Sequence, residues 1–115
     1  MKDPIIFLEH ILENIELVKK LSKNLSRQTL SQNKERQYAI VRAIEVIGEA
    51  MRNLPEFFSK KYPDVAWKEI IGTRDKLIHH YFGVDLDIIY KIINDDMPVL
   101  EKQIKEILKI ETTNI

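Results

Sequence analysis

Apolar residues recur at intervals of three and four along nearly the whole chain, and no segment alternates polar and apolar residues as a half-buried strand does. This period matches the α-helix, on which such positions form a continuous stripe along one face. The sequence holds only three glycines and four prolines, too few for the many short turns of a β-sandwich or β-barrel. We therefore predict an all-α fold.

The first two helices are predicted from stripes in the N-terminal half. The first helix begins at Asp3 and Pro4, an N-cap acid followed by proline at the first helical position, and fades over 22–24. The second helix covers 35–54. Its apolar residues form two adjoining stripes, a large one (Ile40, Ile44, Ile47, Met51, Leu54) and a small one (Ala39, Ala43, Val46, Ala50). Two stripes predict a helix covered on more than one side, and one stripe could face a second subunit.

The other two helices are predicted in the C-terminal half. The third covers 65–81, with Asp64 as its N-cap and Gly83 just beyond its end. The fourth follows the N-cap Asp85. Pro98 interrupts that helix, because proline lacks a backbone donor and clashes with the preceding turn, so we predict a kink or a division there.

The remaining segments are short. We predict a loop or frayed helix start at 26–34, a short amphipathic turn at 56–62, and a loose tail at 111–115. Four helices with mostly short connections predict an antiparallel four-helix bundle. The length of 115 residues suits one domain, 1–115, and is too small for two cores of useful size.

The composition narrows the range of cell compartments and functions that we expect for this protein. The absence of cysteine excludes disulfides and cysteine-based metal sites. Residues 1–4 do not open a signal peptide, and no window approaches the ~20 apolar residues of a membrane span, so we predict a soluble, cytoplasmic protein. Basic and acidic residues number 18 each, giving zero formal net charge. Proteins that hold nucleic acid by bulk charge are usually basic, so any RNA site has to be local.

One segment concentrates groups capable of chemistry. Two of the three histidines, His79 and His80, adjoin each other and lie close to Arg74, Asp75 and Tyr81. At about 100° per residue, Asp75 and His79 share a helix face, and Arg74 nearly eclipses Tyr81. Arg74 and His79 lie about 140° apart on an ideal helix, so they meet on one phosphate only through a long arginine side chain, a loosened helix end or a second subunit.

These residue types suit metal-free cleavage of RNA. A histidine with a pKa of about 6.5 can remove the proton of a 2′-hydroxyl or protonate the leaving oxygen, and Asp75 can orient the imidazole of His79. The Arg74 guanidinium can hold the scissile phosphate. Because each chain supplies one His79, a two-fold dimer would supply separate acid and base groups. No cofactor and no metal are predicted.

Structural roles compete with each of these assignments. Arginine and histidine near a helix end are often surface ion-pair or capping groups. Tyr81 and Trp67 are residue types that commonly pack against a core, and His10 fits a solvated position. A metal site from Asp75 and His79 would have two ligands, which are too few.

The segment 74–81 has the form R-x4-H-x-Y and resembles the motif of HepT-like toxins of the HEPN superfamily. The resemblance extends to Ile47-Gly48-Glu49-Ala50 on the second helix, to 63–70 leading into the motif helix, and to 82–86 and 95–98 around the fourth. It implies a HEPN-like four-helix bundle, a homodimer, and a ribonuclease whose catalytic residues are Arg74 and His79, with Asp75 and His80 in support.

The resemblance also implies a regulatory partner. HepT-like toxins belong to type II toxin–antitoxin systems and pair with a minimal nucleotidyltransferase antitoxin that transfers AMP to the motif tyrosine, here Tyr81. Such a phosphodiester would put negative charge beside Arg74 and repel RNA phosphate. The residue after the arginine is often asparagine in the family and is Asp75 here. The substrate class is RNA; DNA and membranes are not expected as partners.

Three hypotheses follow for the function. The first is a metal-independent endoribonuclease toxin. The second is a non-catalytic helical partner or nucleotide-binding module of a nucleotidyltransferase, which the neutral net charge and the single His79 per chain favour slightly. The third is a purely structural dimerisation module.

Overall fold

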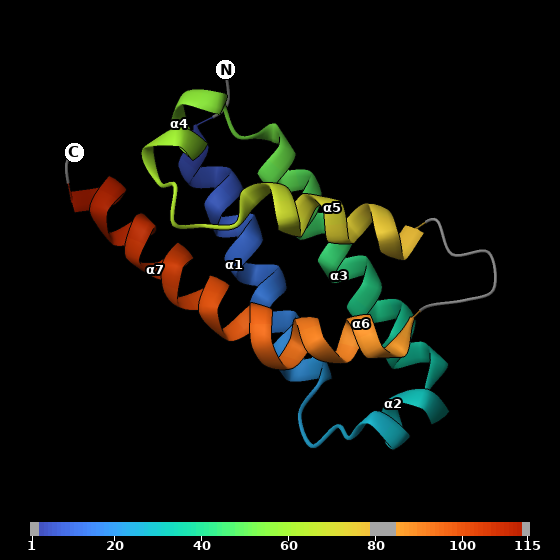
Figure 1. Cartoon of the computed structure of the whole chain (residues 1–115). Helices are drawn as coiled ribbons and strands as arrows, with labels where there is room; N and C mark the ends of the chain where they lie inside the picture. The colour runs from blue at the N-terminus through green and yellow to red at the C-terminus, as the bar shows by residue number, and fades with distance from the viewer. Residues whose placement is uncertain (1–2, 79–84, 114–115) are drawn as a thin grey trace.

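The computed structural model describes residues 3–78 and 85–113 of the chain. Within these ranges it contains helices and no strand, which confirms the predicted all-α class for the described residues. The elements in chain order are α1 (Pro4–Leu21), α2 (Arg27–Gln32), α3 (Lys34–Asn53), α4 (Glu56–Lys61), α5 (Trp67–Ile78), α6 (Leu86–Lys91), the π-helical segment η1 (Ile92–Asp96) and α7 (Met97–Thr113) (Figure 1).

Helix α1 begins as the sequence predicts. The Asp3 side chain accepts a hydrogen bond from the backbone N–H of Ile5 at 3.0 Å, and Pro4 is the first helical residue. The helix ends at Leu21, and Asn24, with a φ of 59°, makes the turn that follows it. Asparagine tolerates this left-handed conformation better than most residues. The predicted start and end of the first helix are therefore confirmed.

The expected loop at 26–34 contains a short helix, α2. Ser26 and Thr29 form a reciprocal capping box, in which the Ser26 hydroxyl accepts from the Thr29 N–H and the Thr29 hydroxyl accepts from the Ser26 N–H. Leu30 is fully buried and attaches the helix to the rest of the chain. Because the helix has one buried side chain, its sequence shows no apolar stripe, and the prediction of a loop or frayed start was wrong over 27–32.

Helix α3 lies at the centre of the packing. It packs against α1, α2 and α5 (Figure 1). Helix α1 also packs against α7. Ala43 and Ala50 of its small stripe are buried within this one chain, and Ala39 and Val46 are half-buried. The predicted helix covered on more than one side is confirmed, and neighbouring helices of the same chain do much of the covering.

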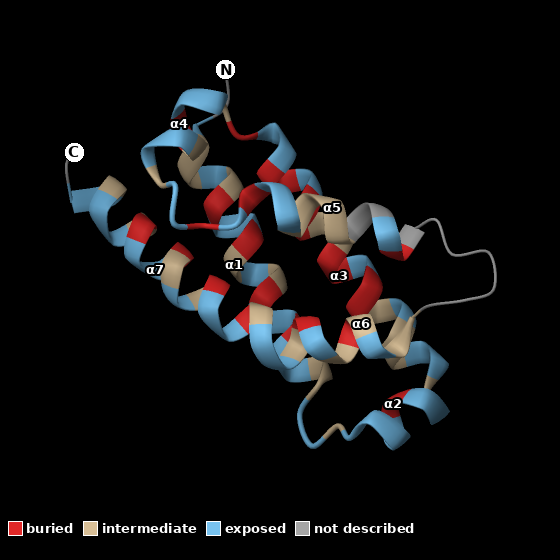
Figure 2. Cartoon of the chain, in the orientation of Figure 1, coloured by how far each residue is buried: buried red, intermediate tan, exposed pale blue. Residues whose placement is uncertain are grey.

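The core fills the space between these helices. Figure 2 shows buried positions where α1, α3 and α7 face one another. The side chains with less than 2% exposure are Leu8, Ile11, Ile15, Val18, Leu30, Ile40, Ile44, Ile47, Ile89, Met97, Leu100 and Ile104. Burial of aliphatic side chains at about 25 cal/mol per Å² supplies the main force that holds the helices together.

The connector between α4 and α5 corrects two boundaries. The predicted short turn at 56–62 contains the helix α4. The third helix begins at Trp67, so Asp64 is not its N-cap. Instead the chain bends through 63–65, and the Trp67 indole N–H donates to the Tyr62 carbonyl at 2.9 Å. This bond fixes the first residue of α5 to the connector. The predicted end of the helix at 81 and the stop at Gly83 lie outside the described residues.

The fourth predicted helix is divided near Pro98. Asp85 caps α6, accepting from the N–H groups of Asp87 at 3.0 Å and Ile88 at 3.2 Å. The chain then widens into the π-helical segment η1, where the Met97 N–H donates to the Ile92 carbonyl five residues earlier. The wider turn accommodates Pro98, whose ring would crowd the carbonyl one turn before it in a regular helix. The predicted cap and division are confirmed.

Two further points concern the end of the chain and membranes. Helix α7 continues to Thr113, so the prediction of a loose tail was wrong for 111–113. Among the described helices, none combines the length and the apolar character that crossing a membrane requires.

Candidate functional site

Helix α5 carries the first part of the predicted site. The backbone of Arg74 and Asp75 lies in its C-terminal half, within Trp67–Ile78. In the same turn, Leu77 is buried and Lys76 is exposed. The backbone of Arg74 and Asp75 is helical, as predicted for this part of the third helix.

The rest of the predicted site lies outside the described residues. This applies to His79, His80 and Tyr81, and therefore to the predicted Asp75–His79 contact and the stacking of Arg74 on Tyr81. The catalytic roles of Arg74 and His79, the support from Asp75 and His80, and the modification of Tyr81 stay predictions.

The helix that presents Arg74 is fixed at its start and packed along one face. Trp67 is 9% exposed, as predicted for a core residue, and its indole is bonded to the connector. Helix α5 packs against α3 through Leu77 and the partly buried Ile70 and Ile71. The Thr73 hydroxyl donates to the Glu69 carbonyl at 2.8 Å, so it is used within the helix. The start of the helix that carries Arg74 and one of its faces are therefore held in place.

An exposed ion pair stands where the described chain resumes after the motif. Arg27 of α2 donates from Nε to the Asp87 carboxylate of α6 at 2.6 Å. This hydrogen bond raises the pKa of Arg27 and lowers the pKa of Asp87. Both side chains are largely exposed, so the pair contributes little to stability. Its position connects α2 to the first turn of α6, next to the cap Asp85.

A hollow of about 280 Å³ lies between α5 and the η1–α7 region. Thr73, the residue before Arg74, lines it, and so do the carboxylates of Glu69, Asp95 and Asp96. Lys91 is its one lysine, 3.9 Å from Asp96. Carboxylates repel phosphate, so this hollow is a poor binding place for an RNA backbone.

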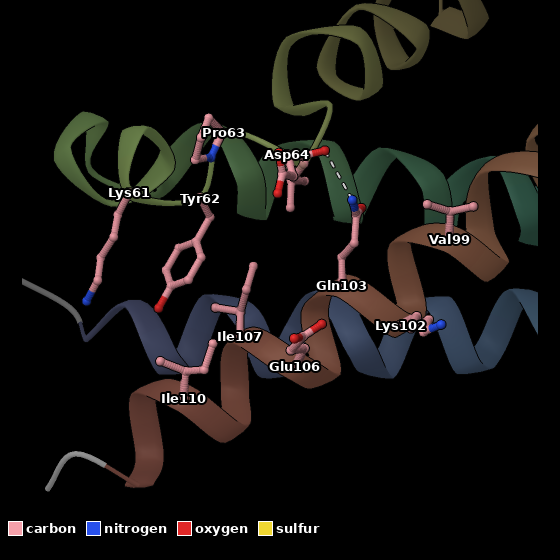
Figure 3. A pocket seen from close by; sticks show the side chains of 11 residues that line it. Lys61, Tyr62, Pro63, Asp64, Val99, Lys102, Gln103, Glu106, Ile107 and Ile110 are labelled. Atoms are coloured by element: carbon pink, nitrogen blue, oxygen red, sulfur yellow. Dashed lines mark hydrogen bonds between the residues drawn. The ribbon is translucent and has the colours of Figure 1, made fainter.

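A larger hollow, about 620 Å³, lies away from Thr73, between the connector after α4 and α7 (Figure 3). Figure 3 shows Tyr62 and Ile110 on its two sides, with the Asp64 carbonyl receiving the Gln103 amide at 3.1 Å. The sequence pattern predicted no functional role for these lining residues, although the exposed Val99 and Ile110 on α7 indicate a second apolar face.

One structural alternative, the solvated position of His10, is tested by the described residues. His10 is exposed on α1, as predicted for a solvated position. Among the described residues, no three histidine, cysteine or acidic side chains are grouped so that they could hold a metal ion.

The sequence matches a known family over most of its length. The model of the family described as "Ribonuclease HepT-like" matches residues 11–107, a range that includes the motif at 74–81. A "Putative RNase" of Caldanaerobacter subterraneus subsp. tengcongensis is 48% identical over 111 residues, covering 96% of this chain and 99% of that protein.

Archaeal proteins give similar matches. A "Putative RNase" of Methanocaldococcus jannaschii is 44% identical, covering 94% of this chain and 89% of that protein. The "Probable ribonuclease HepT" of Thermococcus cleftensis is 38% identical, covering 90% and 94%. No solved structure matches the chain significantly.

Proposed function

The chain belongs to the HepT-like ribonuclease family, and from this membership we propose that it is a metal-independent endoribonuclease that cleaves RNA with Arg74 and His79. The observation that carries the proposal is the R-x4-H-x-Y segment at 74–81, inside the matched range 11–107, with Arg74 on a helix fixed at its start. Arginine and histidine are the groups that phosphodiester cleavage without a metal requires.

The proposed reaction is an internal transfer at phosphorus. His79 removes the proton of the 2′-hydroxyl, and the 2′-oxygen attacks the adjacent phosphorus. The bond from phosphorus to the 5′-oxygen breaks, and that oxygen takes up a proton from a second acid. The products are a 2′,3′-cyclic phosphate and a 5′-hydroxyl end. Arg74 holds the phosphate oxygens as negative charge builds on them.

The second acid is the reason to propose a two-fold homodimer. One His79 cannot be deprotonated as a base and protonated as an acid in the same step. A second copy of the site in one cleft would supply the missing group. Consistent with this scheme, we propose that α1, α3, α5 and the α6–α7 unit form an antiparallel four-helix bundle of the HEPN type, within a single domain covering 1–115.

Regulation is proposed to act on Tyr81. In a type II toxin–antitoxin system the partner would be a nucleotidyltransferase that attaches AMP to the tyrosine oxygen and releases pyrophosphate from ATP. The added phosphodiester would compete for the Arg74 guanidinium and repel incoming RNA. Asp75 and His80 would tune the charge around His79. The proposed place of action is the cytoplasm, where RNA and ATP are available.

Cleavage of total tRNA and mRNA by the purified protein in EDTA tests this proposal. We expect the wild type and His10→Ala to cleave, and His79→Ala and Arg74→Ala to lose cleavage. His10→Ala is the matched control because it removes an exposed histidine on α1. Cleavage by His79→Ala at the wild-type rate would overturn the catalytic assignment. Intact mass, measured on the same preparation, shows whether AMP is attached.

A second function is favoured by the charge of the molecule. The net charge is zero, and the hollow beside Thr73 is acidic, so affinity for RNA from charge alone would be small. In this function the chain is a non-catalytic partner or nucleotide-binding module of a nucleotidyltransferase. Co-purification with that enzyme, and no RNA cleavage by unmodified protein, would favour it. If Arg74→Ala altered neither cleavage nor that complex, a structural dimerisation module would be the better description.

A further inference from the structure

The face of α5 opposite α3 borders an open groove. The two hollows described above share Asp64, Val99 and Gln103 in their linings, so they adjoin along a groove between the connector and α5 on one side and η1 and α7 on the other. We call it the α5–α7 groove. Figure 3 draws the hydrogen bond between Gln103 and Asp64, two residues that line both hollows.

The larger hollow of this groove presents apolar surface to solvent. Val99 is 58% exposed and Ile110 is 41% exposed, and both line it. They lie eleven positions apart on α7, which is three helical turns, so they share a face of that helix. Within the described chain these two side chains keep much of their surface in water. Separate apolar side chains of a partner, one packed on Val99 and one on Ile110, would remove that surface from solvent.

The smaller hollow is negatively charged. Asp64, Glu69, Asp95 and Asp96 line it together with one lysine, Lys91. Among the residues that the structure describes, the Glu69 and Asp95 carboxylates form no ion pair, while Asp96 lies 3.9 Å from Lys91. The arrangement attracts cations and repels phosphate.

We propose that the α5–α7 groove is a docking site for a peptide segment of a protein partner that carries lysine or arginine beside apolar residues. Its apolar side chains occupy the larger hollow between Val99 and Ile110. Its basic side chains meet Glu69 and Asp95 in the smaller one. The two hollows together are lined by five acidic residues (Asp64, Glu69, Asp95, Asp96, Glu106) and three lysines (Lys61, Lys91, Lys102). This excess of negative charge, concentrated in the smaller hollow, selects a basic segment over RNA, because an RNA backbone would bring phosphate to carboxylates.

Docking there would act on the helix that carries Arg74. Helix α5 is packed closely on α3, and the groove separates its other side from η1 and α7. A segment bound in the groove would contact α5 and α7 together and hold α5 more firmly. The binding itself needs neither cleavage of RNA nor modification of Tyr81, so it stands independently of the proposed function.

Binding of short labelled peptides to the full chain tests the proposal by fluorescence anisotropy. The probe is an amphipathic peptide of leucine and lysine, compared with a leucine–glutamate peptide and a serine–lysine peptide of the same length. We expect only the leucine–lysine peptide to bind well, with affinity falling as salt is raised. Methyl NMR shifts on titration should be centred on Val99 and Ile110.

Three single variants separate the groove from general charge effects. Asp95→Lys and Val99→Lys should each weaken binding by about tenfold or more. Glu13→Lys, which makes the same change of charge as Asp95→Lys at an exposed site on α1, should leave binding unchanged. Circular dichroism checks that each variant is folded.

Several results would overturn the proposal. One is equal weakening by Glu13→Lys and Asp95→Lys, which would mean non-specific charge attraction. Another is binding of a single-stranded RNA oligomer with methyl shifts at Val99, which would make the groove an RNA site. A third is a pair of observations: the wild type binds none of the peptides, and light scattering shows a dimer for the wild type but a monomer for Val99→Lys. That pair would assign the groove to a second copy of the chain.

Discussion

The Tyr62 hydroxyl donates a hydrogen bond to the Glu111 carboxylate and so joins the connector after α4 to the last turns of α7. Lys61 donates to the same carboxylate oxygen at 2.9 Å. The backbone carbonyl of Tyr62 meanwhile receives the Trp67 indole, the first residue of α5. One residue thus connects the C-terminal helix to the helix that carries Arg74, and it also forms part of the α5–α7 groove.

Removing the hydroxyl should loosen this connection. We expect Tyr62→Phe to lower the free energy of unfolding by about 1 kcal/mol, the usual contribution of a partly solvated hydrogen bond, and Tm by about 4 °C for a chain of this size. Urea and thermal unfolding measure the effect. Tyr38→Phe is the control, because Tyr38 is 64% exposed and its hydroxyl makes no hydrogen bond among the described residues. Equal losses in the two variants would contradict the assignment.

The same contact predicts a dependence of stability on pH. The hydrogen bonds from Tyr62 and Lys61 lower the pKa of Glu111 from its ordinary 4.5, so the stabilisation is complete above 4.5 and is lost as the pH falls through the lower folded-state value. Burial and Glu111 raise the pKa of Tyr62 from 10.0 to about 12, so the stabilisation is complete below 10.0 and is lost as the pH rises toward 12.

Glu111→Gln isolates this dependence. The difference in unfolding free energy between wild type and variant should be constant from about pH 5 to about pH 9.5 and should shrink on both sides. Chemical unfolding across this range measures it. A difference that keeps growing below pH 4 would contradict the lowered pKa of Glu111.

Local signals in the sequence predicted the elements that depend on neighbouring residues. Asp3 with Pro4 and Asp85 each identified a helix start, because an N-cap bonds only to the next few residues. The helical end of α7 could not be predicted in this way, since Glu111 is held by Tyr62, 49 positions away in the sequence. Likewise, α2 depends on one buried side chain, Leu30, too little for a stripe.

The same distinction between local and distant contacts applies to the candidate site. The spacing of Arg74, His79 and Tyr81 could be recognised because a motif is local, and the family match now includes it. The α5–α7 groove could not, because Asp95 and Val99 meet Glu69 only when η1 and α7 pass beside α5. Glu69 lies too far in the sequence from Asp95 and Val99 for any helical periodicity to indicate that the three residues are neighbours.

The cap that follows the motif gives a third prediction. Asp85→Ala removes the acceptor of the Asp87 and Ile88 N–H groups in the first turn of α6, so we expect a loss of about 1 kcal/mol in unfolding free energy. Asp85→Asn keeps a capping oxygen and should retain most of the stability. Chemical unfolding of the two variants compares them. Similar losses in both would mean that the negative charge of Asp85, rather than its cap, stabilises the helix.

Gly72 gives a prediction for the helix that carries Arg74. It lies inside α5, two residues before Arg74, and a Cβ built on it meets no described atom within 4 Å. An alanine methyl group at this position would therefore meet no steric clash, and alanine has less conformational freedom than glycine in the unfolded chain. We therefore expect Gly72→Ala to raise the unfolding free energy by about 0.5–1 kcal/mol. Urea unfolding measures this gain, and cleavage of RNA on the same variant separates two roles for the glycine. If stability rises while cleavage stays at the wild-type rate, Gly72 is simply an unoptimised helix position. A gain in stability with lost cleavage would mean that the motif helix has to bend at Gly72 to place Arg74 on the phosphate.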